Sequence, residues 1–272
     1  MGVEGAGTIT ETGEGVNGFA IGNRVSVVPV QSPLVGSGTY ATHANIPASA
    51  LVKSLDGTSA AKEASIWMAA LQAYNLLCKV SVGAGDAVVV TAGTSPVGSA
   101  LIQFAREMGA TVFATTRTSE RQQELLAVGA HHAIATDEEV LSEAVRGETA
   151  GSGVEIVFDT VDGAVLTQSI LSLAERGQRV QLRRAVDAGH KCRARGCAAR
   201  GSRPPEPVVR RSLELTQAPE RFEAAKAYIR KVVASGPYQP LIDSVFKLDE
   251  VEQAHRRLDG GRLNGKIVLV TS

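Results

Sequence analysis

The feature that most constrains the fold of this chain is a regular alternation, from residue 87 onward, of short apolar runs with amphipathic segments. Ala87–Thr91, Thr111–Thr115 and Val154–Phe158 are runs rich in β-branched and other apolar residues, typical of strands buried on both faces. Between the first two, residues 96–108 place apolar side chains at helical spacing on one face. Strands that alternate with helices in this way form right-handed βαβ units. We therefore expect an α/β fold with a doubly wound parallel sheet that helices cover on both faces.

The other expected elements continue this alternation and place an all-β part before it. We expect strands at Val25–Pro29, Tyr40–Ile46, His132–Ala135 and Gln178–Leu182, and helices at Thr58–Cys78, from Ser119 to Gly129, from Thr136, and near Val165–Glu175. Two of these helices open on a capping-box pattern, Ser119 with Gln122 and Thr136 with Glu139. The first 55 residues look all-β, whereas the rest of the chain is expected to be α/β.

Composition excludes several classes of protein. Hydrophobic residues make up 44% of the chain and charged residues 21%, which is typical of a globular protein and excludes wholesale disorder. No apolar run approaches the length of a membrane helix, about 18 residues, and the opening residues lack the basic and apolar regions of a signal peptide. Three cysteines and a net charge of zero argue against a disulfide scaffold and against a molecule that binds polyanions. We expect a cytoplasmic protein that binds neither membranes nor nucleic acid.

The turn between the first buried strand and its helix, Thr91–Gly98, carries the clearest chemistry. Gly93 permits a tight turn, Pro96 suits the first helical position, and Gly98 lets the helix pack close to the strand. Free N–H groups there, together with the helix dipole, form a seat for a pyrophosphate. Because only two of the three glycines of the G-x-G-x-x-G pattern are present, a tight connection without a ligand stays open. The residues expected to seat a dinucleotide are Ala92, Gly93, Thr94, Ser95, Val97 and Gly98.

The end of the next strand indicates which dinucleotide is bound. Proteins that bind NAD place an Asp or Glu there for the ribose hydroxyls, but Ala114–Thr118 contains no acid. Arg117 is suited to a 2′-phosphate because its guanidinium presents a fork of donors, and Thr116, Thr118 and Arg121 are expected to add hydroxyls and charge. This pattern predicts NADP (NADPH) as the cofactor, and ordinary solvated surface arginines are the alternative.

Polar residues elsewhere point less clearly to function. Asp159 and Thr160 follow the Val154–Phe158 run, at the carboxyl edge of the predicted sheet where ligands bind. They are expected to line the cofactor cleft, or else to cap a helix. The histidines are expected to be structural, because His43 lies on a predicted strand and His131 and His132 have no Cys or acidic partner at ligand spacing.

Taken together, these motifs resemble the medium-chain dehydrogenase/reductase superfamily, most closely its quinone-oxidoreductase-like branch, often named zinc-binding dehydrogenases. The resemblance is carried by residues 87–109 and 114–122, and it covers nearly the whole chain except residues 183–211. Other matching pieces are Gly2–Gly7, Gly22–Val25, Tyr40–His43, Ala64–Tyr74, Val157–Gly163 and Asn264–Val268.

The resemblance implies a GroES-like β domain at residues 1–57, a Rossmann domain that binds NADP at residues 58–235, and a C-terminal segment, 236–272, that returns to the first domain. It also implies hydride transfer between NADPH and a quinone, an enone or another carbonyl or alcohol substrate, with homodimers as the family tendency. No catalytic side chain is assigned. A catalytically impaired, nucleotide-binding remnant of the same fold is the alternative.

The sequence departs from the family pattern at its start and at the metal positions. Family members normally carry further residues before the Gly2–Gly7 piece, so we expect an N-terminally truncated chain with only part of the GroES-like domain. Zinc-dependent members have His and Cys ligands where this chain has Val3 and Met68, and no Cys precedes Cys78. Without these ligands no metal is expected. Glu4, which matches a family carboxylate, is expected to be structural.

Residues 183–211 stand apart in composition. Eight Arg and one Lys against Asp187 and Glu206 give this stretch a charge of +7, and it contains no Leu, Ile, Phe or Met. A strand at a sheet edge needs alternating apolar residues to bury one face, and like charges repel each other at low salt. We therefore expect an exposed, poorly ordered loop in place of a sixth strand, and weakened dimerisation at that edge. Two compensating frameshifts are our hypothesis for its origin.

Overall fold

The computed structural model describes residues 1–28, 38–161, 164–181 and 218–271. The chain divides into two compact units, one formed by residues 1–72 and 215–272 and the other by residues 73–214. The segment 183–211 lies outside the described residues, so the loop expected there stays a prediction. The domain limits near 57 and 235 that the resemblance implies stay predictions as well.

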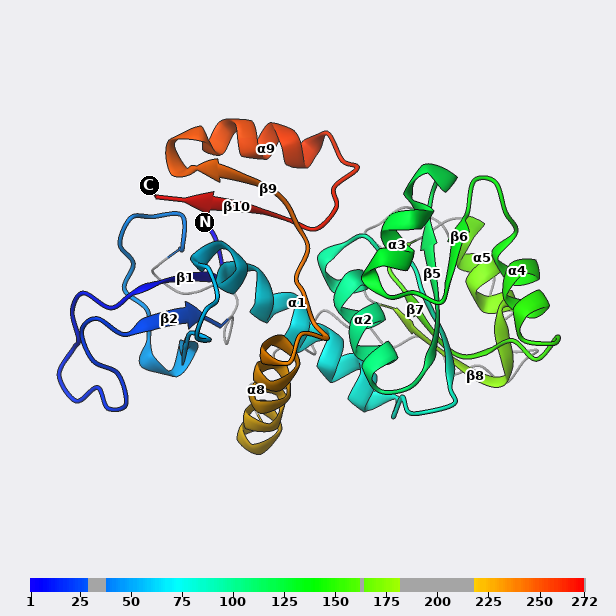
Figure 1. The fold of residues 1–272 in the computed structure, drawn as a ribbon, viewed down its shortest axis with the longest axis horizontal. Helices are drawn as coiled ribbons and strands as arrows, with labels where there is room; N and C mark the ends of the chain where they lie inside the picture. The colour runs from blue at the N-terminus through cyan, green and yellow to red at the C-terminus, as the bar shows by residue number, and fades with distance from the viewer. Residues whose placement is uncertain (29–37, 162–163, 182–217, 272) are drawn as a thin grey trace. The chain divides into compact units, whose positions relative to one another are not determined.

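The unit of residues 73–214 is built on a parallel sheet (Figure 1). Its described strands are β4 (Ala87–Val90), β5 (Thr111–Thr116), β6 (His132–Ala135), β7 (Val154–Asp159) and β8 (Leu173–Gln181). They lie in the order β6-β5-β4-β7-β8, and each of these pairings is parallel. The chain therefore builds outward from β4 to β6 and then returns to the other side of β4. This confirms the expected doubly wound sheet, whose switch point, where such folds bind ligands, lies at the carboxyl ends of β4 and β7.

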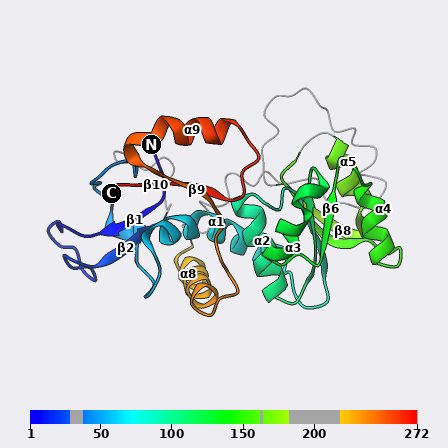
Figure 2. The same ribbon diagram turned by 45° about the horizontal axis from the view of Figure 1, so that its top comes forward.

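Helices cover both faces of this sheet. The described ones are α2 (Pro96–Glu107), α3 (Gln122–Val128), α4 (Leu141–Glu148) and α5 (Ala164–Leu171). Helices α2 and α3 lie on one face, and α4 and α5 lie on the other (Figures 1 and 2). The apolar face predicted for residues 96–108 is the buried face of α2, where Leu101, Phe104 and Ala105 are at most 1% exposed.

The described part of the other unit holds two small sheets. An antiparallel sheet joins β1 (Gly5–Thr8), β2 (Arg24–Val27) and β3 (Leu51–Lys53), and a parallel pair joins β9 (Ile242–Lys247) to β10 (Lys266–Val270). Helix α9 (Val251–Asp259) connects β9 to β10 and lies beside them (Figure 2), and α8 (Pro219–Ala234) precedes β9. Helix α1 (Ala60–Lys79), expected at Thr58–Cys78, begins in this unit and ends in the other. Among the described residues, no helix is both long and apolar enough to cross a membrane.

The strand expected at Tyr40–Ile46 is wrong. Its backbone bends, and Tyr40 donates its N–H to the Met1 carbonyl (3.0 Å) at the very start of the chain. The adjoining Thr39 packs its side chain against Gly5 and donates its hydroxyl to the Glu4 carbonyl (2.7 Å). The antiparallel sheet instead uses β1 and β3, which the sequence pattern did not indicate because the run of β1 is rich in glycine.

Neither expected capping box forms. The Ser119 N–H donates to the Glu138 carboxylate (2.8 Å), and Gln122 turns its amide to the Ala133 carbonyl (2.9 Å). Ser119 therefore opens a short 3-10 turn, Ser119–Arg121, without a side-chain cap. Likewise Glu139 accepts from the Ala135 N–H (2.9 Å), so the helix expected from Thr136 begins only at Leu141. In both places the side chain that should form the capping box bonds instead to the backbone of β6, at Ala133 for Gln122 and at Ala135 for Glu139.

The helix expected near Val165–Glu175 is too long at its carboxyl end. Helix α5 ends at Leu171, and β8 begins two residues later. Leu173 pairs with Val154 in the sheet and is 4% exposed. Burial of Leu173 and pairing with β7 therefore outweigh the helical pattern of this stretch.

Candidate cofactor site

The turn after β4 leads into α2 with a complete local cap. Pro96 is the first helical residue, as expected, and the Ser95 hydroxyl accepts from the Gly98 N–H (3.1 Å). Among the described residues, none accepts a hydrogen bond from the backbone N–H of Thr94 or Val97. These two donors lie at the positive end of a 12-residue helix, so an anion placed there would be bound by both N–H groups and the dipole.

The glycines of this turn provide space, and the unusual backbone angle falls on Ala92. A Cβ on Gly98 would collide with the Ala92 carbonyl and lie 3.0 Å from Gly93 Cα, which confirms the close packing of helix on strand. A Cβ on Gly93 would lie 2.6 Å from Leu125 Cδ2. Gly93 lies inside a tight turn, as expected, which the Ser95 N–H closes by donating to the Ala92 carbonyl (3.0 Å), but the residue in the left-handed region is Ala92, at φ 49°. For a residue with a side chain this region costs on the order of 1–3 kcal/mol, so the surroundings must hold it.

The end of β5 contains the residues expected to bind a 2′-phosphate. Arg117 is exposed, whereas Thr116 is 9% exposed and Thr118 is half-buried. Arg121 donates from Nε and Nη2 to one carboxylate oxygen of Glu124, at 3.1 and 2.7 Å, so part of its positive charge is offset. These residues therefore lie in one short stretch after β5, in which Arg117 is the exposed positive charge.

An acid that the sequence did not indicate lies beside this stretch. Glu138, from the turn after β6, accepts from the Ser119 N–H, and this hydrogen bond lowers the pKa of the Glu138 carboxyl. Glu138 comes near only because β6 pairs with β5, so nothing in the local sequence around Ser119 signals it.

At the switch point, β7 and β8 contribute a buried polar network. Asp159 is 2% exposed and accepts from the Val161 N–H (3.0 Å) and from Arg179 Nη1 (3.1 Å). Burial raises the pKa of Asp159, and the two donors oppose that shift. Thr160 bonds to Thr91 at the end of β4. Arg179 was not among the candidate residues, although an arginine inside the predicted strand Gln178–Leu182 is the signal that would have indicated it.

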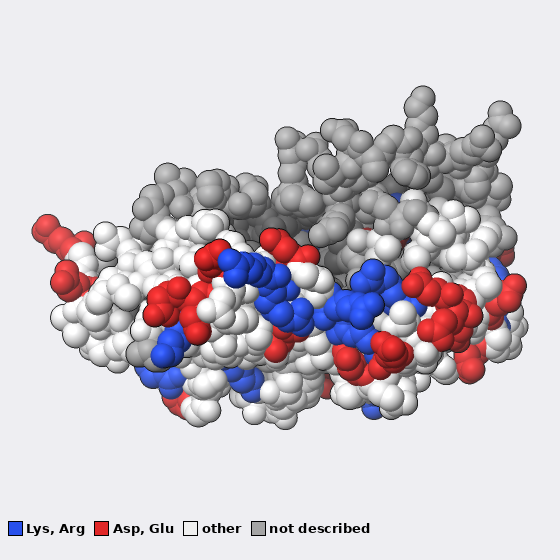
Figure 3. Space-filling view, turned by 90° about the horizontal axis from the view of Figure 1, so that it is seen from above, with Lys and Arg blue, Asp and Glu red and all other residues white. Residues whose placement is uncertain are grey.

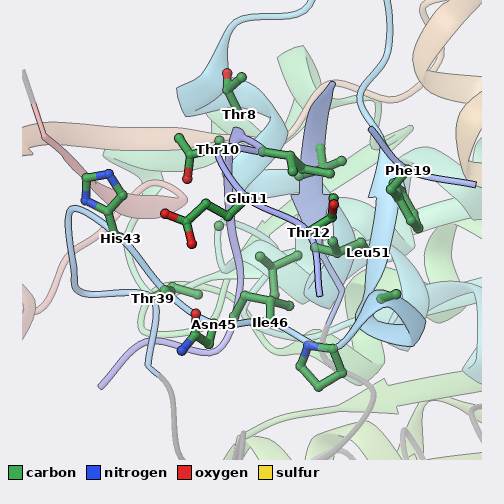
Figure 4. A pocket seen from close by; sticks show the side chains of 18 of the residues that line it. Thr8, Thr10, Glu11, Thr12, Phe19, Thr39, His43, Asn45, Ile46 and Leu51 are labelled. Carbon is green, nitrogen blue, oxygen red and sulfur yellow. The ribbon is translucent and has the colours of Figure 1, made fainter. Parts of the chain in front are cut away.

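The unit that contains β1 has a wide open groove of its own, about 1070 Å³ in volume. β1, the residues that follow it and residues 38–47 form its lining (Figure 4). Thr10, Glu11 and His43 project into the groove, and His43 lies in a bend instead of the expected strand. The described hydrogen bond of His43 is to the neighbouring Thr42 hydroxyl (3.4 Å). The groove thus contains polar side chains but no hydrogen-bonded acid–base pair among the residues described.

Glu4, which precedes β1, bonds to both α1 and β10 of that unit. Its carboxylate accepts from the Met68 N–H of α1 (3.0 Å) and pairs with Lys266 of β10. Burial, and secondarily the charge of Glu4, raise the pKa of the buried Tyr238 hydroxyl. No group of three or more His, Cys, Asp or Glu in the described part of the chain could hold a metal ion. The structural role expected for Glu4 agrees with these bonds, and the lack of a zinc site stays a prediction.

Two family models match the chain, one for each expected domain. The alcohol dehydrogenase GroES-like domain matches residues 1–56, and the zinc-binding dehydrogenase model matches residues 96–183. The chain belongs to the medium-chain dehydrogenase/reductase superfamily. This dehydrogenase/reductase fold combines the antiparallel sheet and the parallel sheet described above, as the resemblance implied.

Relatives of the chain include a reductase and parts of larger synthases. A phenolphthiocerol/phthiocerol polyketide synthase protein of Mycobacterium tuberculosis is 27% identical over 99% of this chain, which spans only 12% of that synthase protein. The 2-haloacrylate reductase of a Burkholderia species is 28% identical, with 99% of this chain and 80% of the relative covered. The solved structure of mycobacterial Rv1454c complexed with NADPH has a TM-score of 0.84 and 27% identity, covering 99% of this chain and 82% of that one.

The surface of the described residues mixes charges of both signs. On the face drawn in Figure 3, Lys and Arg side chains lie next to Asp and Glu. Among the ion pairs of the described residues, Arg256 with Glu252 is exposed, with side chains 71% and 78% exposed. Exposed pairs of this kind contribute about 0–1 kcal/mol each to stability, so they balance charge more than they stabilise the fold.

Proposed function

We propose that this protein is an NADP-dependent oxidoreductase that passes hydride between NADPH and a small quinone, enone or other carbonyl compound without zinc. The observation that carries the proposal is the helix start at the switch point, where the N–H groups of Thr94 and Val97 have no acceptor among the described residues. The neighbouring strand β5 ends in Ala114–Thr118, a segment that carries Arg117 and contains no acid of its own. The NADPH complex of Rv1454c and the 2-haloacrylate reductase support the cofactor and the reaction class.

The chain's own residues would bind and orient the cofactor. The N–H groups of Thr94 and Val97 would hold the pyrophosphate, and Gly98 would let the backbone approach it. Thr116, Arg117, Thr118 and Arg121 would hold the 2′-phosphate by charge-assisted hydrogen bonds. NADPH, when bound, supplies the hydride, and the protein supplies the orientation. No general acid is assigned, because a reduced quinone oxygen can take its proton from water.

The test is a comparison of NADPH and NADH. We expect NADPH to bind at least about tenfold more tightly, a difference of about 1.4 kcal/mol. Arg117→Ala should remove most of this preference, while Arg176→Ala, which removes another exposed arginine of the same unit, should leave it unchanged. Binding is followed by the fluorescence of the reduced nicotinamide, and turnover by its oxidation in the presence of quinones and enones.

Two results would contradict the proposal. Equal affinities for NADPH and NADH would refute the assignment of the 2′-phosphate site. Tight NADPH binding without oxidation by any quinone, enone or simple carbonyl tested would favour the catalytically impaired remnant.

A further inference from the structure

A chain of polar contacts links β8 to the start of the cofactor turn. Arg179 on β8 pairs with Asp159 at the end of β7 (Nη1 to Oδ2, 3.1 Å), and the side chains are 7% and 2% exposed. The other carboxylate oxygen of Asp159 accepts from the Val161 N–H and lies 3.4 Å from the Thr91 hydroxyl at the end of β4. Three neighbouring strands are therefore joined at their carboxyl ends, and the chain of contacts ends on the residue before Ala92.

Thr91 and Thr160 close this connection with a reciprocal pair of hydrogen bonds, here called the threonine clasp. The Thr160 N–H donates to the Thr91 hydroxyl (2.7 Å), and the Thr160 hydroxyl donates to the Thr91 carbonyl (3.2 Å). That carbonyl belongs to the peptide that enters Ala92, the left-handed residue of the turn. A strained residue persists only where its surroundings over-determine its backbone. The clasp is one such constraint, and the bond from the Gly93 N–H to the Thr115 carbonyl (3.0 Å) is another.

Charge decides what each member of the network contributes. Of the described groups that face Asp159, Arg179 is the charged one, since β4 contributes the Thr91 hydroxyl and the turn after β7 contributes the Val161 N–H. Removing one partner of a buried ion pair leaves the other charge uncompensated. Without Arg179, that charge would be a buried carboxylate next to the turn where an anion is proposed to bind.

We infer that Arg179 and Asp159 are positioning residues for the dinucleotide: their ion pair holds the threonine clasp, and the clasp holds Ala92 so that the N–H groups of Thr94 and Val97 face the pyrophosphate. The inference rests on the proposed function, because it concerns the same site. It places Asp159 and Thr160 behind the turn, where they act without touching the cofactor.

The experiment measures the affinity of ADP-ribose, which has the pyrophosphate but no 2′-phosphate, and of NADPH, by calorimetry across mildly acidic to mildly alkaline pH. Arg179→Met should weaken both affinities about tenfold at alkaline pH, or about 1.4 kcal/mol. Loss of the guanidinium also raises the pKa of Asp159 further. As the pH falls, Asp159 becomes neutral, so the affinity relative to wild type should recover. The double variant Asp159→Asn/Arg179→Met should show little pH dependence and bind more tightly than Arg179→Met at alkaline pH.

Two further variants separate positioning from general stability. Arg146→Met removes an arginine that bonds to the Gly151, Leu171 and Leu173 carbonyls at the amino-terminal end of β7 and β8. It should destabilise the fold without any pH-dependent change in ADP-ribose affinity. Thr91→Val removes the hydroxyl that accepts from the Thr160 N–H, one of the two bonds of the clasp, without changing charge, so it should weaken binding equally at every pH. Circular dichroism of each variant without ligand verifies that it folds.

The outcomes distinguish this inference from the proposed function. If the wild-type protein binds neither ligand, the proposed function fails and the inference falls with it. If the wild type binds but Arg179→Met and Thr91→Val bind equally well, the inference alone is overturned. The same holds if Arg179→Met loses affinity equally at all pH values and the double variant recovers nothing. Should Arg179→Met fail to fold, Thr91→Val and Asp159→Asn/Arg179→Met decide, and wild-type affinity in Thr91→Val overturns the inference.

Discussion

Replacing Gly98 with alanine should damage both stability and cofactor binding, because the added methyl has no space. Its Cβ would collide with the Ala92 carbonyl and lie 2.9 Å from Ser95 Oγ and 3.0 Å from Gly93 Cα. Two of these neighbours are backbone atoms, which cannot rotate away. The turn and the start of α2 must therefore separate, and the cap from Ser95 to the Gly98 N–H is disturbed in the process.

The size of the effect follows from two opposing terms. Overpacking of this kind costs about 1–3 kcal/mol, while exchanging glycine for alanine in a helix gains about 0.5–1 kcal/mol. The net expectation for Gly98→Ala is a loss of about 1–2 kcal/mol in the free energy of unfolding, within these ranges. Because the turn moves, NADPH affinity should fall by at least about tenfold, which corresponds to about 1.4 kcal/mol.

Gly147→Ala is the matched control for this prediction. Gly147 lies within α4, and a Cβ there would meet no atom within 4 Å. This variant should therefore gain about 0.5–1 kcal/mol from the helix term alone and keep its NADPH affinity. The assay is urea unfolding of both variants, followed by NADPH titration. If both alanine variants shift the free energy of unfolding equally and bind NADPH as wild type does, the argument from close packing is refuted.

Two further predictions concern the phosphate site and metal. Glu124→Gln should raise NADPH affinity by up to about fivefold and leave NADH affinity unchanged, because the half-buried carboxylate that competes for Arg121 contributes about 0.2–1 kcal/mol. An equal gain for both cofactors in titrations would contradict this. Elemental analysis of protein purified without a metal-affinity tag should find no stoichiometric zinc, because Val3 and Met68 stand where zinc-dependent family members have His and Cys ligands. One zinc per chain would show this expectation to be wrong.

Much of the parallel sheet and the cofactor turn could be predicted from the sequence because the signals are local. The runs at Ala87–Thr91 and Val154–Phe158 are apolar throughout, as strands covered on both faces must be. Ser95 and Pro96 cap the helix start with groups from the same few residues. The interpretation of Arg117 likewise needed only its position after a strand, although its contact with a 2′-phosphate remains a proposal.

What the tertiary structure decided depends on partners far apart in the chain. Glu138 accepts from the Ser119 N–H, which the pairing of β5 with β6 brings near, so the capping pattern at Ser119 does not form and α3 begins only at Gln122. A single hydrogen bond is worth about 0.5–1.5 kcal/mol whether its partner is near or distant in sequence, so local pattern alone cannot say which one forms. The ion pair of Asp159 with Arg179 is of the same kind: the sequence determined that both residues lie on or beside strands, but only the parallel register of β7 with β8 placed their side chains together.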